Sequence, residues 1–199
     1  MKKLSVLLIV AGLCFLGYGT YQLFKTEKAQ NTSLGEAQAL LSEKENIDND
    51  EVAAEIAASF SPSMSETAGI LHIPKLESDL PIVEGTDEDD LEKGVGHYDG
   101  TAYPLQNDQI VLSGHRDTVF RRMGELELGD ELIIQLPYGD FSYEIVDTQI
   151  VDADDRTIIS PTAPDEVLTV TTCYPFSYIG SAPDRYIITA LPISKKTDE

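Results

Sequence analysis

The feature that most constrains this chain is an uncharged, largely apolar run near its start, residues 4–24. At about 1.5 Å per residue, a helix of that length spans roughly 31 Å, which matches the hydrocarbon thickness of a bilayer. Lys2 and Lys3 precede the run, and cationic residues at that end favour a cytoplasmic N-terminus. The sequence therefore predicts a transmembrane anchor over residues 1–24, with the rest of the chain on the extracellular side.

A cleaved signal peptide and a lipoprotein are the alternatives to an anchor. A signal peptide has a shorter apolar region followed by a cleavage site of small residues, and residues 17–19 match such a site poorly. A lipoprotein would need a small residue before Cys14, where the chain has Leu13. Each alternative also places the remaining chain outside the cytoplasm, and we favour the uncleaved single-pass anchor.

Beyond the predicted anchor, the chain divides into two further segments that differ in amino-acid composition and pattern. Residues 25–66 are rich in Glu, Ala, Gln, Asn and Ser, which predicts an extracellular stalk or linker that is partly helical, with a short helix over 51–59. Residues 67–194 alternate short β-type segments with turn signals, which predicts one β-rich domain, a sandwich or a barrel, followed by a tail over 195–199. The expected strands cover residues 70–73, 110–113, 131–136, 141–150, 167–172 and 186–191, and short helical pieces are expected near 87–93 and 119–123.

The charge balance excludes several classes of function. The chain has 35 Asp and Glu against 14 Lys and Arg, a formal net charge of -21, so it would repel a phosphate backbone and we expect no nucleic-acid partner. Two cysteines are too few for a disulfide-rich scaffold or a four-cysteine zinc site. The densest carboxylate run contains Asp152, Asp154 and Asp155, which are candidate calcium ligands. That run lacks the Gly and the distal Glu of an EF-hand loop, so a solvated acidic loop is the alternative.

A lone cysteine is the strongest sign of chemistry. With Cys14 in the membrane segment, Cys173 is the only thiol expected outside the cell, where an unpaired thiol is prone to oxidation. It ends a β-branched segment, and Pro175 follows two residues later, which places the thiol at a sheet rim. A buried, inert cysteine is the other interpretation.

A thiol nucleophile also needs a base and a group that stabilises charge. His115 follows the expected strand over 110–113, and Arg185 opens the last expected strand, so three strand ends can converge on one rim. Asp117 either orients the imidazole of His115 or caps the turn that follows it. His97 lies among glycines and His72 within an apolar segment, so both are better explained as structural residues.

Three blocks of the chain resemble the signature blocks of sortases, the membrane-anchored cysteine transpeptidases of Gram-positive bacteria. The blocks are Ser113-Gly114-His115-Arg116-Asp117-Thr118-Val119-Phe120, then Thr171-Thr172-Cys173-Tyr174-Pro175-Phe176, then Pro183-Asp184-Arg185-Tyr186. The resemblance covers roughly residues 70–193. The Cys-Tyr-Pro-Phe run and the lack of an upstream Asp-Pro-aromatic motif are more similar to class D than to the pilin-polymerising class C. Val170 stands where the family strand usually has Leu, a volume change that a strand core tolerates.

The resemblance implies an eight-stranded sortase-type β-barrel with short helices, and a two-step acyl transfer. Cys173 would attack the Thr carbonyl of an LPxTG-like C-terminal sorting signal on a secreted protein. His115 would exchange protons with the leaving and incoming amines, and Arg185 would stabilise the oxyanion, with Thr172 in support. An amine of a lipid-linked peptidoglycan precursor would then accept the protein, and no cofactor is required.

Two other classes of function remain open from the sequence. A different extracellular cysteine protease or hydrolase would also use a thiol. Papain-like enzymes place Cys before His in the chain, whereas here His115 precedes Cys173. Chymotrypsin-like cysteine proteases are characterised by a Gly-x-Cys-Gly elbow, which this chain lacks. A non-enzymatic surface-binding module would explain the anchor, the stalk and the acidic β-rich domain. It would not explain a lone exterior cysteine together with a histidine and an arginine at strand ends.

Overall fold

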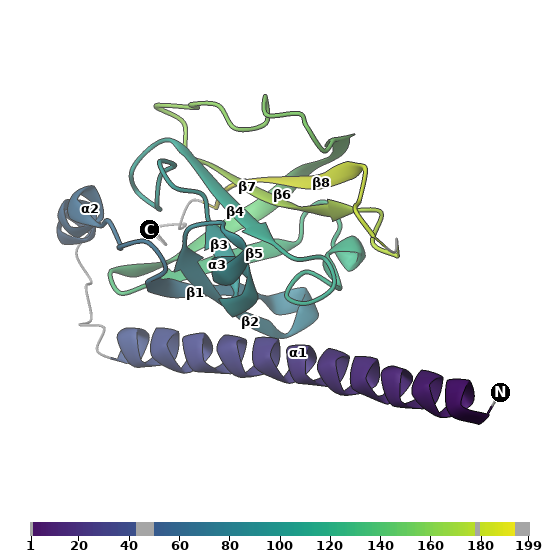
Figure 1. Ribbon diagram of the computed structural model, residues 1–199. Coiled ribbons are helices and arrows are strands. Elements are labelled where there is room, and N and C mark those ends of the chain that lie inside the picture. The colour runs from purple at the N-terminus through teal and green to yellow at the C-terminus, as the bar shows by residue number, and fades with distance from the viewer. Residues whose placement is uncertain (1, 43–49, 178–179, 194–199) are drawn as a thin grey trace.

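The computed structural model describes residues 2–42, 50–177 and 180–193 and contains a closed barrel of eight strands (Figure 1). The strands follow the order β1-β2-β3-β4-β7-β8-β6-β5 around the barrel, and β5 pairs with β1 to close it. The pairs β2–β3 and β4–β7 are parallel and the others are antiparallel. The strands are β1 (Thr67–Ile73), β2 (Ser78–Glu84), β3 (Val95–His97), β4 (Gln109–Gly114), β5 (Glu131–Leu136), β6 (Gly139–Asp152), β7 (Val167–Tyr174) and β8 (Asp184–Pro192).

The core fills the barrel with side chains from alternate strand positions. In β5, Leu132, Ile134 and Leu136 are buried while the residues between them are partly exposed, which is the period-two pattern of a sheet with one face inward. The buried aromatic residues keep their polar ends bonded, because Tyr138 Oη donates to Pro104 O and Tyr143 Oη to Glu166 Oε1. Closure leaves the barrel without an unpaired sheet edge.

The six strands expected from the sequence all form, and two further strands were missed. Strand β2 contains Pro81, whose missing N–H argues against a strand in any pattern-based interpretation. Strand β3 has only three residues, too few to show a period. Helix α3 (Glu88–Lys93) forms where a helical piece was expected, whereas the piece expected over 119–123 is instead a short 3₁₀ helix, η2 (Met123–Glu125). A second 3₁₀ helix, η1 (Pro74–Leu76), follows β1.

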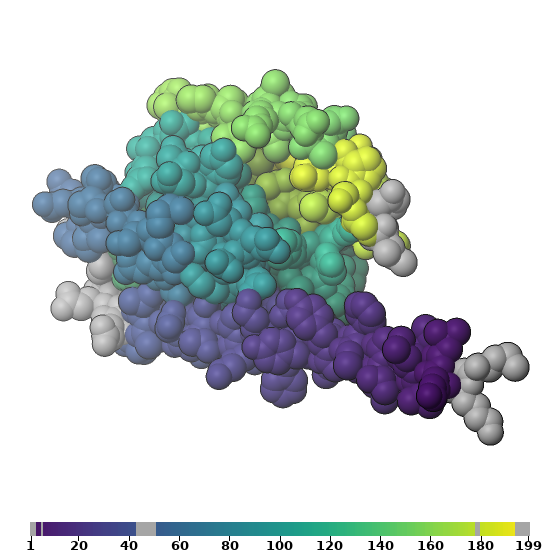
Figure 2. Space-filling view, in the orientation of Figure 1, coloured from purple at the N-terminus to yellow at the C-terminus, as the bar shows by residue number. Residues whose placement is uncertain are grey.

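Helix α1 (Lys2–Ser42) continues without a break from the apolar run into the segment that was expected to be a partly flexible stalk. Ser33 and Ala37 are buried, and α1 contacts β1, β2 and α3. Figure 2 shows the second half of the helix packed along the domain, while its N-terminal end projects past it. The short helix α2 (Asp50–Ser59) confirms the helix expected over 51–59, and the tail predicted over 195–199 lies outside the described residues.

Two contacts fix α1 against the domain. Lys25 Nζ lies 2.8 Å from Glu92 Oε2 on α3, and Thr67 Oγ1 on β1 donates to Glu36 Oε2 at 2.9 Å. The apolar side chains of α1 before Lys25 are largely exposed, as expected of a surface that meets lipid. By length and composition, α1 is the one helix among the described residues that could cross a membrane, although a signal sequence meets the same criterion.

Candidate active site

A cleft of about 670 Å³ lies where β4 and β7 end and β8 begins. Its lining includes the three residues that the sequence singled out from separate strand ends, Cys173, His115 and Arg185. Thr172 lines it as well. Other lining residues come from the segment after β2, from helix α3, from the residue after β3 and from the loop between β6 and β7: Thr86, Leu91, Tyr98, Ala153, Asp155, Arg156, Ile158 and Ile159.

Strand pairing explains why the thiol and the guanidinium meet. Cys173 is a free cysteine near the end of β7, and it lies directly opposite Arg185 in the antiparallel β7–β8 pair. Directly opposed residues have their Cβ atoms about 4.5–5.5 Å apart on one face of a sheet. Arg185 Nη1 donates to Asp184 O at 3.0 Å, which leaves other guanidinium donors available at the cleft. The thiol and the guanidinium therefore lie on one face of the sheet at this end of the β7–β8 pair.

Register also brings the imidazole to the same rim. Strands β4 and β7 run parallel with Gly114 paired to Thr172, so the next residues, His115 just after β4 and Cys173 on β7, lie at the same level of the sheet. Thr172 Oγ1 donates to Gly114 O at 2.7 Å and fastens the two strand ends together. A Cβ at Gly114 would lie 2.5 Å from the Phe120 ring, so only glycine allows the chain carrying His115 to pass so close to that ring.

Aromatic packing braces the segment after the cysteine. The rings of Tyr174 and Phe176 meet edge to face with centroids 5.6 Å apart, and Phe176 meets Tyr186 in the same way at 5.2 Å. Such pairs stabilise beyond the area that they bury. The backbone next to Cys173 is therefore held by side chains from both sides of the β7–β8 turn.

Arg116 directly follows His115 but was not predicted to be a site residue. Its guanidinium is buried, with Nη1 donating to Pro175 O at 3.0 Å and Nη2 to Gly180 O at 2.9 Å, so it joins the loop after β4 to the loop after β7. Its place directly after His115, within the first block that resembles the sortase signature, was the available signal. Asp117 does not line the cleft: its side chain is 80% exposed and Oδ1 lies 3.7 Å from Arg116 Nε.

The other two histidines have structural environments. His97 is 1% exposed, with Nδ1 2.8 Å from Glu84 Oε2 and Nε2 2.9 Å from Ala102 O. In the antiparallel β3–β4 pair His97 lies opposite Leu112, three residues before His115, but it does not line the cleft. His72 lies on the outward face of β1, where Nδ1 is 2.6 Å from Asp79 Oδ1.

The candidate calcium ligands are engaged within their own loop. Asp152 Oδ1 accepts from Asp154 N, and Asp155 Oδ1 accepts from Thr157 N and Oγ1, which lowers the pKa of Asp155. Among the described residues, no group of three or more His, Cys, Asp or Glu side chains is arranged to hold a metal ion. Calcium binding at this run stays a prediction.

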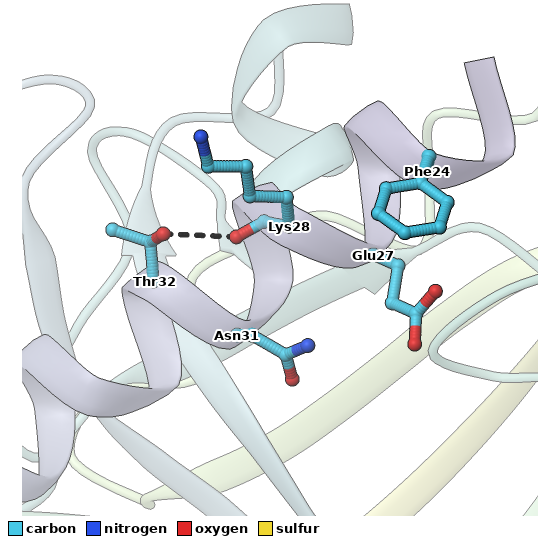
Figure 3. A pocket seen from close by; sticks show the side chains of 5 residues that line it. All are labelled: Phe24, Glu27, Lys28, Asn31 and Thr32. Carbon is cyan, nitrogen blue, oxygen red and sulfur yellow. Dashed lines mark hydrogen bonds between the residues drawn. The ribbon is translucent and has the colours of Figure 1, made fainter. Parts of the chain in front are cut away.

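A smaller hollow of about 350 Å³ lies along α1, away from the cleft (Figure 3). Phe24, Glu27, Lys28, Asn31 and Thr32 line it, and Thr32 Oγ1 donates to Lys28 O within the helix at 2.9 Å. It contains no thiol or imidazole, so we assign the chemistry to the cleft at Cys173.

Comparison with known proteins agrees with this geometry. The family model described as "Sortase domain" matches residues 71–193. The chain is 54% identical over 192 residues to Sortase D of Bacillus subtilis (strain 168), covering 94% of this chain and 97% of that protein. Among solved structures, a Clostridium perfringens Sortase D5 transpeptidase superposes with a TM-score of 0.68 at 25% identity, covering 83% of this chain and 99% of the other. The catalytic domain of Bacillus anthracis SrtD gives a TM-score of 0.57 at 44% identity, covering 67% and 92%. The chain therefore belongs to the sortase family of cysteine transpeptidases, and its likeness to Sortase D supports class D.

Proposed function

We propose that this sortase cleaves an LPxTG-like sorting signal at the Thr carbonyl through a thioacyl-enzyme, and transfers the protein to an amine of a lipid-linked cell-wall precursor. The observation that carries the proposal is the convergence of Cys173, His115 and Arg185 on one cleft from the ends of three strands. A nucleophile, a proton carrier and a fixed positive charge are the groups that acyl transfer needs.

In the first step, the Cys173 sulfur attacks the Thr carbonyl carbon and the oxygen takes up negative charge. The guanidinium of Arg185 stabilises that oxyanion, a role that suits its permanent charge and its several donors. The peptide C–N bond then breaks, and His115 gives a proton to the departing amine. A thioester joins the substrate to the enzyme.

In the second step, the amine of the acceptor attacks the thioester carbonyl, and His115 takes up the proton that the amine loses. The C–S bond breaks, the sulfur leaves as thiolate, and a new amide bond joins the protein to the cell-wall precursor. All of this chemistry uses side chains of the chain itself, so we propose that the reaction requires no cofactor.

We further propose that residues 1–24 are an uncleaved single-pass anchor with the barrel on the extracellular side. The unbroken course of α1 from the apolar run into the docked segment supports an anchor over a cleaved signal. Substrate and lipid-linked acceptor both emerge at the outer leaflet, so a tethered enzyme meets them at a raised effective concentration.

The test is turnover of a sorting-signal peptide with and without an added amine. We expect a thioacyl adduct on the wild-type chain and an amide product when amine is present. Cys173→Ala should abolish both, while Cys14→Ala, which removes the other cysteine, should leave turnover unchanged. Unimpaired cleavage by Cys173→Ala would refute the proposal.

The two supporting roles are tested in the same assay. His115→Ala should lower turnover by about 10²–10⁴-fold and Arg185→Ala by about 10²–10³-fold. Matched replacements at His72 and Arg122, which lie outside the cleft, should retain wild-type turnover. Near-normal turnover by either cleft variant would remove that residue from the proposed site.

A further inference from the structure

One wall of the cleft is formed by the loop over residues 153–166, which joins β6 to β7 and has no helix or strand of its own. Ile158 and Ile159 supply its apolar part. A loop of this length presents a defined surface only when other parts of the fold hold it. The side chains that hold it are therefore candidates for setting the shape of the cleft.

Gln109, the first residue of β4, holds the loop at the cleft wall. It is 7% exposed, and its Nε2 donates to Ile158 O at 2.7 Å while its Oε1 accepts from Ser160 N at 2.9 Å. The Ile158 carbonyl and the Ser160 N–H flank Ile159, so the Gln109 carboxamide binds the loop on both sides of this lining residue. Nε2 also donates to Thr169 Oγ1 at 2.9 Å, so Gln109 connects the loop to β7, the strand that carries Cys173.

The preceding residue holds a more distant part of the same loop. Asp108 Oδ1 accepts from Thr162 N at 2.6 Å and from Ala163 N at 3.1 Å. Neither Thr162 nor Ala163 lines the cleft. Of the two residues, Gln109 is thus the one whose bonds reach the lining segment.

We propose that Gln109 is a positioning residue for recognition of the sorting signal: it fixes residues 158–160 so that Ile158 and Ile159 form a preformed apolar wall beside Cys173. This rests on the proposed function, in which the peptide occupies the cleft. A wall that is already ordered lowers the entropy cost of binding, so its loss weakens substrate binding more than the chemical step.

The substitution Gln109→Leu tests the proposal because it keeps the size of the side chain and removes all three bonds. With active enzyme titrated by thiol alkylation, we expect KM for the sorting-signal peptide to rise roughly tenfold while kcat stays within about twofold. Hydrogen exchange at the Ser160 N–H should speed up, because its acceptor is gone.

Gln106→Leu is the matched control. Gln106 lies three residues earlier, and its Nε2 donates to Ala57 O at 2.7 Å and to Phe60 O at 3.2 Å, which belong to the segment before the barrel. The same replacement there should lower the unfolding temperature to a comparable extent. It should leave KM and exchange at Ser160 unchanged.

Two results would overturn the proposal. One is faster exchange at Ser160 in Gln109→Leu with an unchanged KM, and the other is an equal rise in KM for both variants. If Gln109→Leu does not fold, Gln109→Met replaces it: the unbranched side chain is of similar length and also removes all three bonds, so KM should again rise roughly tenfold. Failure of the proposed function has a separate signature, which is turnover by Cys173→Ala.

Discussion

At the scale of single residues, the barrel contains a buried polar cluster in which hydrogen bonds stabilise the charged form of one carboxylate. Glu84 is 6% exposed, lies 2.8 Å from His97 Nδ1, and accepts from Tyr103 Oη at 2.6 Å. Burial alone would raise the pKa of Glu84, but the bonds to His97 and Tyr103 outweigh it and hold that pKa below its ordinary value of 4.5. Burial and the adjacent Glu84 raise the pKa of Tyr103, so it stays a neutral donor.

This cluster predicts a loss of stability in acid. A carboxyl whose pKa is depressed in the folded state stabilises the fold above its unfolded pKa and loses that contribution as the pH falls through the folded value. The free energy of unfolding should therefore decrease between about pH 5 and about pH 3. Glu84→Gln, which cannot titrate, should show a smaller decrease over that range in chemical denaturation.

The exposed Glu144 on β6 provides the matched control for Glu84. Glu144→Gln should leave the acid loss as large as in the wild-type chain. An acid loss in Glu84→Gln equal to that of the wild type would show that other carboxyls are responsible.

At the scale of elements, the loops after β4 and β7 are joined by one buried guanidinium. Arg116 donates to Pro175 O and Gly180 O, and Arg116→Met would leave both carbonyls without these bonds. We expect a loss of roughly 1–3 kcal/mol in unfolding free energy and a fall in turnover, because His115 lies in the first of these loops and Cys173 lies on β7 just before the second. Arg116→Lys should restore part of both, since lysine keeps the charge but not the fork of donors.

Arg122→Met is the control for that loop contact. Arg122 pairs with Glu125 and donates to Leu76 O, with half of its side chain exposed, so its loss should cost little stability and no turnover. If Arg116→Met retained full turnover and wild-type stability, the loops would be positioned by other contacts.

Elements with strong local patterns could be predicted, and those fixed by tertiary contacts could not. Residues 131–136 and 141–150 were expected to be strands and form β5 and most of β6, whereas the three residues of β3 form a strand only because β2 and β4 pair with them. At the site, residue type and strand ends placed Cys173, His115 and Arg185 correctly at one rim. The roles of Arg116 and Gln109 could not be predicted, because their hydrogen-bond partners are backbone atoms of distant loops, which leave no pattern in the sequence.

At the scale of the whole molecule, one helix links the N-terminal apolar run to the catalytic domain. Small residues on one side of α1, such as Ala29, Ser33 and Ala37, let it lie close to the barrel, and Lys25 pairs with Glu92 one residue after the apolar run ends. A docked helix restricts the orientations of the barrel that a flexible stalk would allow. For the membrane anchor proposed above, this contact would set the height and direction of the cleft above the bilayer.

Ala37→Arg should release that contact without unfolding the barrel. Ala37 is fully buried against the domain, so a long charged side chain there must displace the helix, whereas Ala39→Arg places the same residue on the exposed side. In the full chain in lipid nanodiscs, amide exchange over residues 26–41 should rise at least about tenfold in Ala37→Arg and stay near wild type in Ala39→Arg. Turnover of a soluble sorting-signal peptide should be kept by both variants, because no residue of α1 lines the cleft. Unchanged exchange in Ala37→Arg would mean that the helix is held by contacts outside this face, and a loss of peptide turnover would mean that docking is needed for the barrel itself.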